Sequence, residues 1–314
     1  MKNQRKTIIA LALILIIALT IIPISVEAKP SKLPKGLEKK IPKKGFIVKT
    51  DLGDVIRYRE YIPLDIEALE SYIPPNMGIE LPDAIYYSVN VYAYENDGSV
   101  VLIDSGHELL AKKLFARIRA DFGKKPIIVL LTHGHAEHAG GGSFLQKHGA
   151  EIYVHEADEM MVQLGHKFPG MTVPEHFTYT GYDPLTYDSS EIAGCSIIPT
   201  PGHTDGSVCL LHQNTGILFT GDLTIPELDL LFDDPDITSE LDLFSLRYTP
   251  EEMLEDQYDS LESIRMNLMM SIYMGVPSPY SGIYPGHKEP YIGIYPMLYI
   301  LGYTQGVISE ILLE

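Results

Sequence analysis

The sequence is poor in cysteine and in basic residues, and each shortage excludes a class of protein. Only two of its 314 residues are cysteines, so neither a disulfide scaffold nor a cysteine-rich zinc module can hold the fold. Its 24 lysines and arginines are outnumbered by 42 aspartates and glutamates, which gives a formal net charge of −18. A nucleic-acid-binding protein needs a basic face toward phosphate, so the acid excess argues against nucleic acid as a partner.

The charge is divided unequally between the beginning of the chain and the remainder. Residues 1–49 carry eleven basic and two acidic side chains, a balance of +9, whereas the remainder carries −27. Basic residues precede an apolar run at 8–22, and Val26 and Ala28 stand where a signal peptidase reads small residues. Residues 1–28 are therefore expected to be a signal peptide or a membrane anchor of an extracytoplasmic protein, secreted or membrane-anchored. The run is shorter than the roughly 20 apolar residues of a membrane span, which favours the cleaved signal.

A basic segment separates this apolar run from the body of the protein. Residues 29–45 contain seven lysines, three prolines and two glycines, and little that could pack. They predict a solvated basic linker. The alternative is tethering to a membrane surface through anionic headgroups, at about 1 kcal/mol per lysine. Residues 46–314 show no internal repeat and are expected to form one domain.

Short strands and helices follow one another in two groups along this domain. Strands are expected at 46–50, 54–59, 84–94, 99–104, 127–131, 151–155, 192–199, 207–212, 216–220 and 281–284, and helices at 109–122, 138–148, 250–273 and 289–314. Two groups of strands, each followed by helices, predict a layered α/β structure. In this structure two sheets pack on each other with helices outside.

Histidines gather directly after the apolar strand predicted at 127–131. Three histidines and one glutamate fall within six residues there, at His133, His135, Glu137 and His138. Residues two apart in an extended segment point the same way, so His133 and His135 can converge on one cation. Glu137 and His138 stand at the start of a helix, where their side chains can face a second cation position. A histidine-rich surface loop is the alternative, but it would suit a lone histidine better than this cluster.

Three further motifs place a single metal-binding side chain after an apolar strand. His203 lies in the sequence PGHTDGS, Asp222 ends the sequence TGD, and His287 ends the sequence PGH. Each is flanked by glycine and is expected at a sheet edge, where loops carry function. Together with the first cluster they supply five histidines and two carboxylates, enough ligands for two ions.

These motifs resemble, in the same order, those of the metallo-β-lactamase-fold hydrolases. The family motif T-H-x-H-x-D-H-x-G-G is similar to residues 132–141, with Glu137 in place of the aspartate. The resemblance covers roughly residues 46–290 and implies a four-layer αββα sandwich with the active site at one edge of the two sheets. It makes residues 46–314 the catalytic domain. Asp104 resembles an aspartate that supports the site without binding metal.

The resemblance implies two metal ions held by these motifs. One ion takes His133, His135 and His203, and the other takes Glu137, His138 and His287, with Asp222 bridging the two. Zinc is expected, with iron or manganese as alternatives, because imidazole and carboxylate suit all three. Since Glu137 is one methylene longer than aspartate, three outcomes are open. It ligates the second ion, it acts only as a base toward bound water, or the second site is weak and the enzyme mononuclear.

Glu137 and Asp222 are the residues to which the resemblance assigns catalysis. Two zinc ions bridged by hydroxide supply a nucleophile at neutral pH, and Glu137 is placed to orient it and pass on its proton. This predicts hydrolysis of an ester, thioester, lactone or amide bond in a small-molecule substrate. The bridging Asp222 is similar to that of hydroxyacylglutathione hydrolases (glyoxalase II) and lactonases more than to β-lactamases proper. A mononuclear iron enzyme resembling persulfide dioxygenases, or a non-catalytic metal-binding module, is the alternative.

The two cysteines lie on predicted strands that flank His203. Antiparallel pairing about a turn near residue 202 would let Cys195 and Cys209 face each other. A disulfide would then need a Cα spacing of about 5.5–6 Å. The alternative, which we favour, is two small buried hydrophobic side chains.

Overall fold

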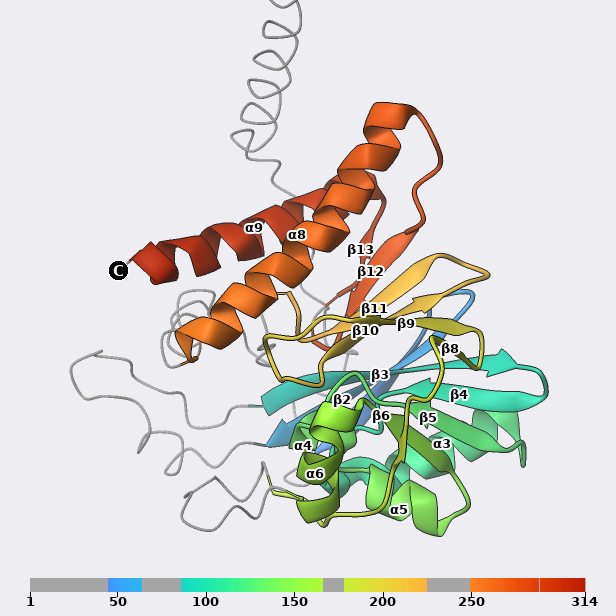
Figure 1. The fold of residues 1–314 in the computed structure, drawn as a ribbon. Helices are drawn as coiled ribbons and strands as arrows, with labels where there is room; N and C mark the ends of the chain where they lie inside the picture. Colours follow the sequence, from blue (N-terminus) through green and yellow to red (C-terminus); the bar gives the residue numbers. More distant parts are fainter. Residues whose placement is uncertain (1–44, 64–85, 166–177, 225–248, 288, 314) are drawn as a thin grey trace, which may run out of the picture.

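Two β-sheets packed face to face, with helices on both outer faces, make up the protein (Figure 1). The computed structural model describes residues 45–63, 86–165, 178–224, 249–287 and 289–313. The four-layer αββα prediction is therefore confirmed. The expected signal peptide or anchor at 1–28 and the basic linker at 29–45 lie outside the described residues, except for Gly45.

The first sheet contains seven strands in sequence order. These are β1 (Phe46–Asp51), β2 (Ile56–Pro63), β3 (Tyr86–Asn96), β4 (Ser99–Ile103), β5 (Ile127–Leu130), β6 (Glu151–Val154) and β7 (Leu185–Thr186). Strands β1 to β4 pair antiparallel, as the two predicted hairpins require, and β4 to β7 pair parallel. Asp97 and Gly98 both take positive φ, which gives the two-residue turn between β3 and β4 the twist that hairpins favour.

The helices of the first group cover the outer face of this sheet (Figure 1). They are the short η3 (Glu108–Leu110), α3 (Ala111–Phe122), α4 (Ala136–Ala139), α5 (Gly142–Lys147) and α6 (Glu156–Leu164). The expected single helix at 138–148 is wrong, because Gly140 and Gly141 separate two short helices, α4 and α5. The Gly141 N–H donates to the Gly106 carbonyl there, and a Cβ on Gly141 would lie 2.2 Å from the Ser105 carbonyl oxygen. Helix α6 was not expected.

The second sheet has the order β13-β12-β11-β10-β9-β8. Its strands are β8 (Glu191–Ile192), β9 (Cys195–Pro199), β10 (Val208–His212), β11 (Ile217–Gly221), β12 (Gly282–Pro285) and β13 (Tyr291–Ile292), and its outer face carries α8 (Glu251–Met274) and α9 (Ile294–Leu313). The expected strand at 192–199 is in fact the hairpin β8–β9, turned by Ala193 and Gly194 at positive φ. The expected helix at 289–314 begins only after β13. Within the described ranges, no helix combines the length and hydropathy needed to cross a bilayer.

Parallel pairing brings the functional strand ends to one edge of the sandwich. Strand β4 runs parallel to β5, and β11 runs parallel to β12. Apolar side chains of both sheets fill the space between them, among them Tyr92, Ile103, Leu130, Leu210 and Phe219. The segments that follow β4, β5, β11 and β12 carry Asp104, His133, Asp222 and His287. The core thus fixes the strands whose ends carry the motifs.

Cys195 and Cys209 are both free and buried. In the β9–β10 pair, Cys209 stands opposite Ile198 and Cys195 opposite His212. This register points the two thiols to opposite faces of the sheet, because side chains alternate along a strand. Cys195 packs between the sheets and Cys209 packs under the outer helices. The disulfide alternative is therefore wrong, and both cysteines act as small hydrophobic side chains.

Glu60 of β2 is a buried carboxylate beneath the loop that follows β4. Its Oε2 accepts a 2.8 Å hydrogen bond from the His107 N–H, while its Oε1 has no partner within the described part of the chain. Gly106, at φ +69°, packs over it so closely that a Cβ would lie 2.7 Å from the carboxyl group. Burial raises the pKa of Glu60 to about 8, with the His107 N–H acting in the opposite direction.

Replacing Glu60 is expected to change how stability depends on pH. Its pKa rises from 4.5 to about 8 on folding, so the folded protein binds more protons between these values, and stability falls as pH rises. In Glu60→Gln the unfolding free energy falls less steeply over this window, by up to about 1.4 kcal/mol per pH unit. Urea unfolding between pH 5 and 8 measures this. The exposed Glu191→Gln is the control, and equal slopes for wild type and E60Q would contradict the account.

Candidate metal centre

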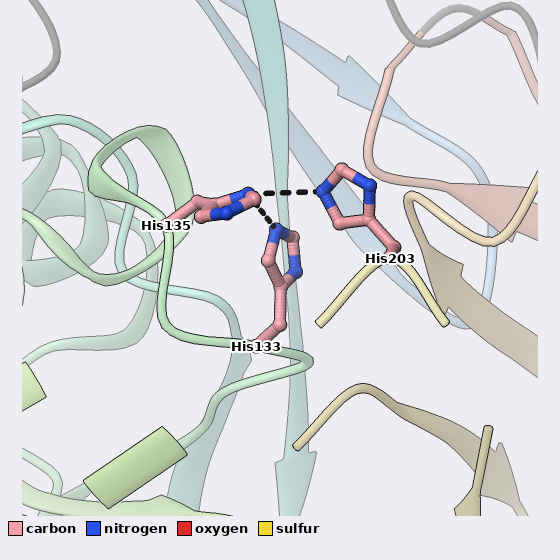
Figure 2. Close-up of side chains that lie close together, drawn as sticks. All are labelled: His133, His135 and His203. Carbon is pink, nitrogen blue, oxygen red and sulfur yellow. Dashed lines mark hydrogen bonds between the residues drawn. The ribbon is translucent and has the colours of Figure 1, made fainter. Parts of the chain in front are cut away.

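Three histidines converge on one point at the open edge of the sandwich (Figure 2). His133 and His135 come from the loop after β5, and His203 comes from the loop between β9 and β10. The Nδ1 atom of His135 lies 3.2 Å from Nε2 of His133 and 2.9 Å from Nε2 of His203. Each ring therefore offers one nitrogen toward a common centre, and this set could hold a metal ion.

Four buried side chains form a second group. Glu137 and His138 lie on α4, Asp222 follows β11, and His287 follows β12. One ligand atom from each falls within 4.8 Å of the others. The two groups are the same two that the sequence resemblance implied, with Glu137 in the second.

The Asp222 carboxylate faces both groups. Its Oδ2 lies 3.8 Å from Nε2 of His133 and 3.5 Å from Nε2 of His203. The same Oδ2 lies 3.2 Å from Nε2 of His287, and Oδ1 lies 3.2 Å from Nε2 of His138. This carboxylate is therefore placed to bridge two ions.

Hydrogen bonds to the Nδ1 atoms, on the ring sides away from the other ligands, orient the two histidines of the second group. The Nδ1 atom of His138 lies 2.8 Å from Oδ2 of Asp104, and Nδ1 of His287 bonds to the carbonyl of Ser88. These bonds place the ring proton on Nδ1 and leave Nε2 for a ligand. Asp104 also accepts bonds from the backbone N–H and the hydroxyl of Thr132. As expected, Asp104 supports the site from outside either group.

Asp158 of α6 joins the two loops of the first group, and sequence reasoning missed it. It is 1% exposed and accepts hydrogen bonds from the Gly134 N–H, the Thr204 hydroxyl and the Gly206 N–H, at 2.8, 2.8 and 3.0 Å. Gly134 separates His133 from His135, while Thr204 follows His203. The only sequence signal was the acidic run that follows β6.

Two buried arginines hold the loop that carries His287, and they too were missed. Arg57 donates to both carboxylate oxygens of Glu289, at 2.7 and 3.1 Å, and Nη1 of Arg59 lies 3.1 Å from the same carboxylate. Arg59 also donates to the Asn90 side chain at 2.9 Å. Burial opposes ionisation of Glu289, but the bond from Arg57 and the charge of Arg59 outweigh it and lower the pKa.

The buried polar atoms of the second group fit a cation. Nε2 of His138 and Oδ1 of Asp222 lie 3.2 Å apart, yet neither makes a hydrogen bond with any described residue. Leaving a buried donor or acceptor without a partner costs about 1–3 kcal/mol. A metal ion between the two atoms would satisfy both. Imidazole and carboxylate together suit zinc, iron and manganese.

The protonation states of the site also fit a cation. Burial opposes ionisation of Asp222, but the charges of His138 and His287 outweigh it and hold its pKa well below the ordinary value. Burial, together with His135, lowers the pKa of His203 to about 3. A neutral imidazole and an ionised carboxylate are the forms that bind metal. Burial also opposes a charge on His138, but Asp222 and Asp104 raise its pKa, so the second group favours positive charge.

A family model and curated relatives match this chain. The model of the family described as the metallo-beta-lactamase superfamily matches residues 85–257, more than half of the chain. The chain is 30% identical over 152 residues to "Probable metallo-hydrolase YybB" of Bacillus subtilis, covering 46% of this chain and 66% of that protein. It is 34% identical over 129 residues to a hydroxyacylglutathione hydrolase of Xanthomonas campestris, covering 40% and 42%. The chain thus spans less than two thirds of these relatives.

Solved structures share the fold at low sequence identity. The mono-zinc form of the metallo-beta-lactamase FIM-1 from Pseudomonas aeruginosa superposes with a TM-score of 0.54 at 15% identity. The match covers 87% of this chain and 99% of that one. A metallo-beta-lactamase from Pontibacter korlensis gives a TM-score of 0.53, also at 15% identity, covering 84% and 99%.

Removing the Asp158 carboxylate is expected to loosen the first group of histidines. Asp158→Ala frees the two loops that carry them, and the loss of such a supporting partner typically costs about 10–100-fold in metal affinity. Zinc titration against a chromophoric chelator measures this loss. Glu156→Ala, an exposed residue on the same helix, should bind zinc as wild type does. Wild-type affinity in D158A would show that Asp158 does not support the site.

Proposed function

The chain belongs to the metallo-beta-lactamase superfamily, and from this premise we propose that it is a hydrolase that works with two zinc ions. The observation that carries the proposal is the position of Asp222, whose carboxylate lies 3.2–3.8 Å from ligand nitrogens of both histidine groups. His133, His135 and His203 would hold one ion. Glu137, His138 and His287 would hold the other, with Asp222 shared.

The chemistry follows from the charges of these side chains. When bound, zinc ions lower the pKa of water toward about 7 and polarise a carbonyl oxygen. Burial opposes ionisation of Glu137, but the charges of His135 and His138 outweigh it and lower the pKa of the carboxyl group. Glu137 is thus ionised at neutral pH and can accept a proton from attacking water and release it toward the leaving group.

The substrate class that we propose is a small molecule with an ester, thioester, lactone or amide bond. The relatives named hydroxyacylglutathione hydrolase support cleavage of an acyl bond. The residues from 50 onward carry a net charge of −27, which disfavours polyanions such as nucleic acid.

We also propose an extracytoplasmic location, secreted or membrane-anchored. Support comes from the apolar run at 8–22 and the small residues Val26 and Ala28. The basic linker that follows could add contact with anionic headgroups at a membrane surface.

A metal count on the purified protein, combined with a hydrolysis screen, tests this function. We expect two zinc ions per chain and cleavage of one member of a lactone, thioester and amide panel. His133→Ala and His203→Ala should each lose zinc and hydrolysis together, because both rings face the same ion. The exposed His148→Ala should keep both. If the two site variants kept the metal content and the activity of wild type, the proposal would fail.

A further inference from the structure

A tyrosine that the motifs do not include reaches into the second group of ligands. Tyr87 of β3 is only 4% exposed, and its hydroxyl donates a 3.1 Å hydrogen bond to Oε1 of Glu137. The hydroxyl oxygen of Tyr87 also lies 3.2 Å from Nε2 of His287. The two rings are also in contact, with their centroids 5.0 Å apart. Tyr87 therefore touches two side chains of this group at once.

The acceptors around Tyr87 assign the direction of this contact. Nδ1 of His287 bonds to the carbonyl of Ser88, an acceptor, so Nδ1 carries a ring proton. The carboxylate of Glu137 can only accept, so the single hydroxyl hydrogen of Tyr87 lies toward Oε1 of Glu137. Adjacent residues of β3 thus hold both the ring of His287 and the carboxylate of Glu137.

Two other tyrosines of the same strand make a different kind of contact. Tyr92 donates to the Pro285 carbonyl at 2.8 Å, and Tyr94 donates to the Ala193 carbonyl at 3.0 Å. Both are neutral bonds to the backbone. The bond from Tyr87 ends on a buried carboxylate, and charge-assisted bonds are roughly twice as strong as neutral ones.

We propose that Tyr87 is a positioning residue for the second metal ion. Its hydroxyl fixes the carboxylate of Glu137 beside His287. Glu137 can then bind the second ion at the motif position where the similar family has the shorter aspartate. Glutamate has one more rotatable bond than aspartate, and ordering it costs more conformational entropy. The hydrogen bond from Tyr87 offsets that cost. This inference rests on the proposed two-ion function and adds to it a residue for the second ion alone.

Zinc titration of the full chain tests the role of Tyr87. Tyr87→Phe removes only the hydroxyl and keeps the ring against His287. We expect an unchanged affinity for the first ion and about 10–100-fold weaker binding of the second, as for other residues that orient metal ligands. Tyr94→Phe, which also removes a buried hydroxyl from β3, should bind both ions as wild type does. Equal second-ion affinity in Y87F and wild type would overturn the inference.

A double-mutant cycle with Glu137→Asp separates positioning from a general effect on folding. The shorter aspartate should lack the contact with Tyr87, so in an E137D protein the additional change Y87F should alter second-ion affinity by less than about 2-fold. A purely structural role for Tyr87 would give the same loss in both backgrounds. The same loss in both backgrounds would therefore overturn the inference.

The wild-type protein gives a readout that does not depend on the folding of any variant. Once Glu137 binds a cation it accepts the hydroxyl bond more weakly, so the second equivalent of zinc should perturb the ultraviolet absorption of one tyrosine. A perturbation with the first equivalent, or with neither, contradicts the role of Tyr87. A wild-type protein that binds one ion overturns both this inference and the two-ion function. Two ions with no effect of Y87F overturn this inference alone.

Discussion

Burial of the Asp222 carboxylate between two groups of imidazoles is the interaction on which the site depends. The residue is 4% exposed, and one of its carboxylate oxygens has no hydrogen-bond partner among the described residues. A charge removed from water in this way is tolerated only when opposite charge lies close to it. His138 and His287 supply it from one side, while His133 and His203 lie on the other. The negative charge of the buried Asp222 carboxylate is therefore balanced by positive charge, carried either by protons on the imidazoles or by metal ions.

The fold holds this arrangement by fixing the ends of strands rather than the loops themselves. Asp104 and Asp222 directly follow β4 and β11, and His287 follows β12. The loops are then tied down by acidic side chains. Asp158 joins the loops that carry the first group, and Glu289 joins the His287 loop to the arginines of β2. Acidic residues thus serve the site as supports as well as candidate ligands.

Much of the site could be predicted from local sequence, because five of its seven candidate ligands stand beside a glycine in segments that follow apolar strands. Apart from Asp104, which the resemblance indicated, the supports could not be predicted, since they act across the fold. Tyr87 is 50 residues from Glu137 and 200 from His287, and nothing near it in sequence indicates a site. The layers were also predictable from alternating strands and helices. The break at Gly140–Gly141 was not, because it depends on the close approach of Ser105, which lies on another loop.

The proposed function requires these side chains to hold two ions that share Asp222. Anomalous diffraction from crystals of the zinc-loaded protein, measured on both sides of the zinc absorption edge, locates bound zinc without reference to activity. Two peaks are expected. One should lie among His133, His135 and His203, and the other beside His138 and His287, with the Asp222 carboxylate between them. A single peak, or a second peak away from Asp222, would contradict the proposed function.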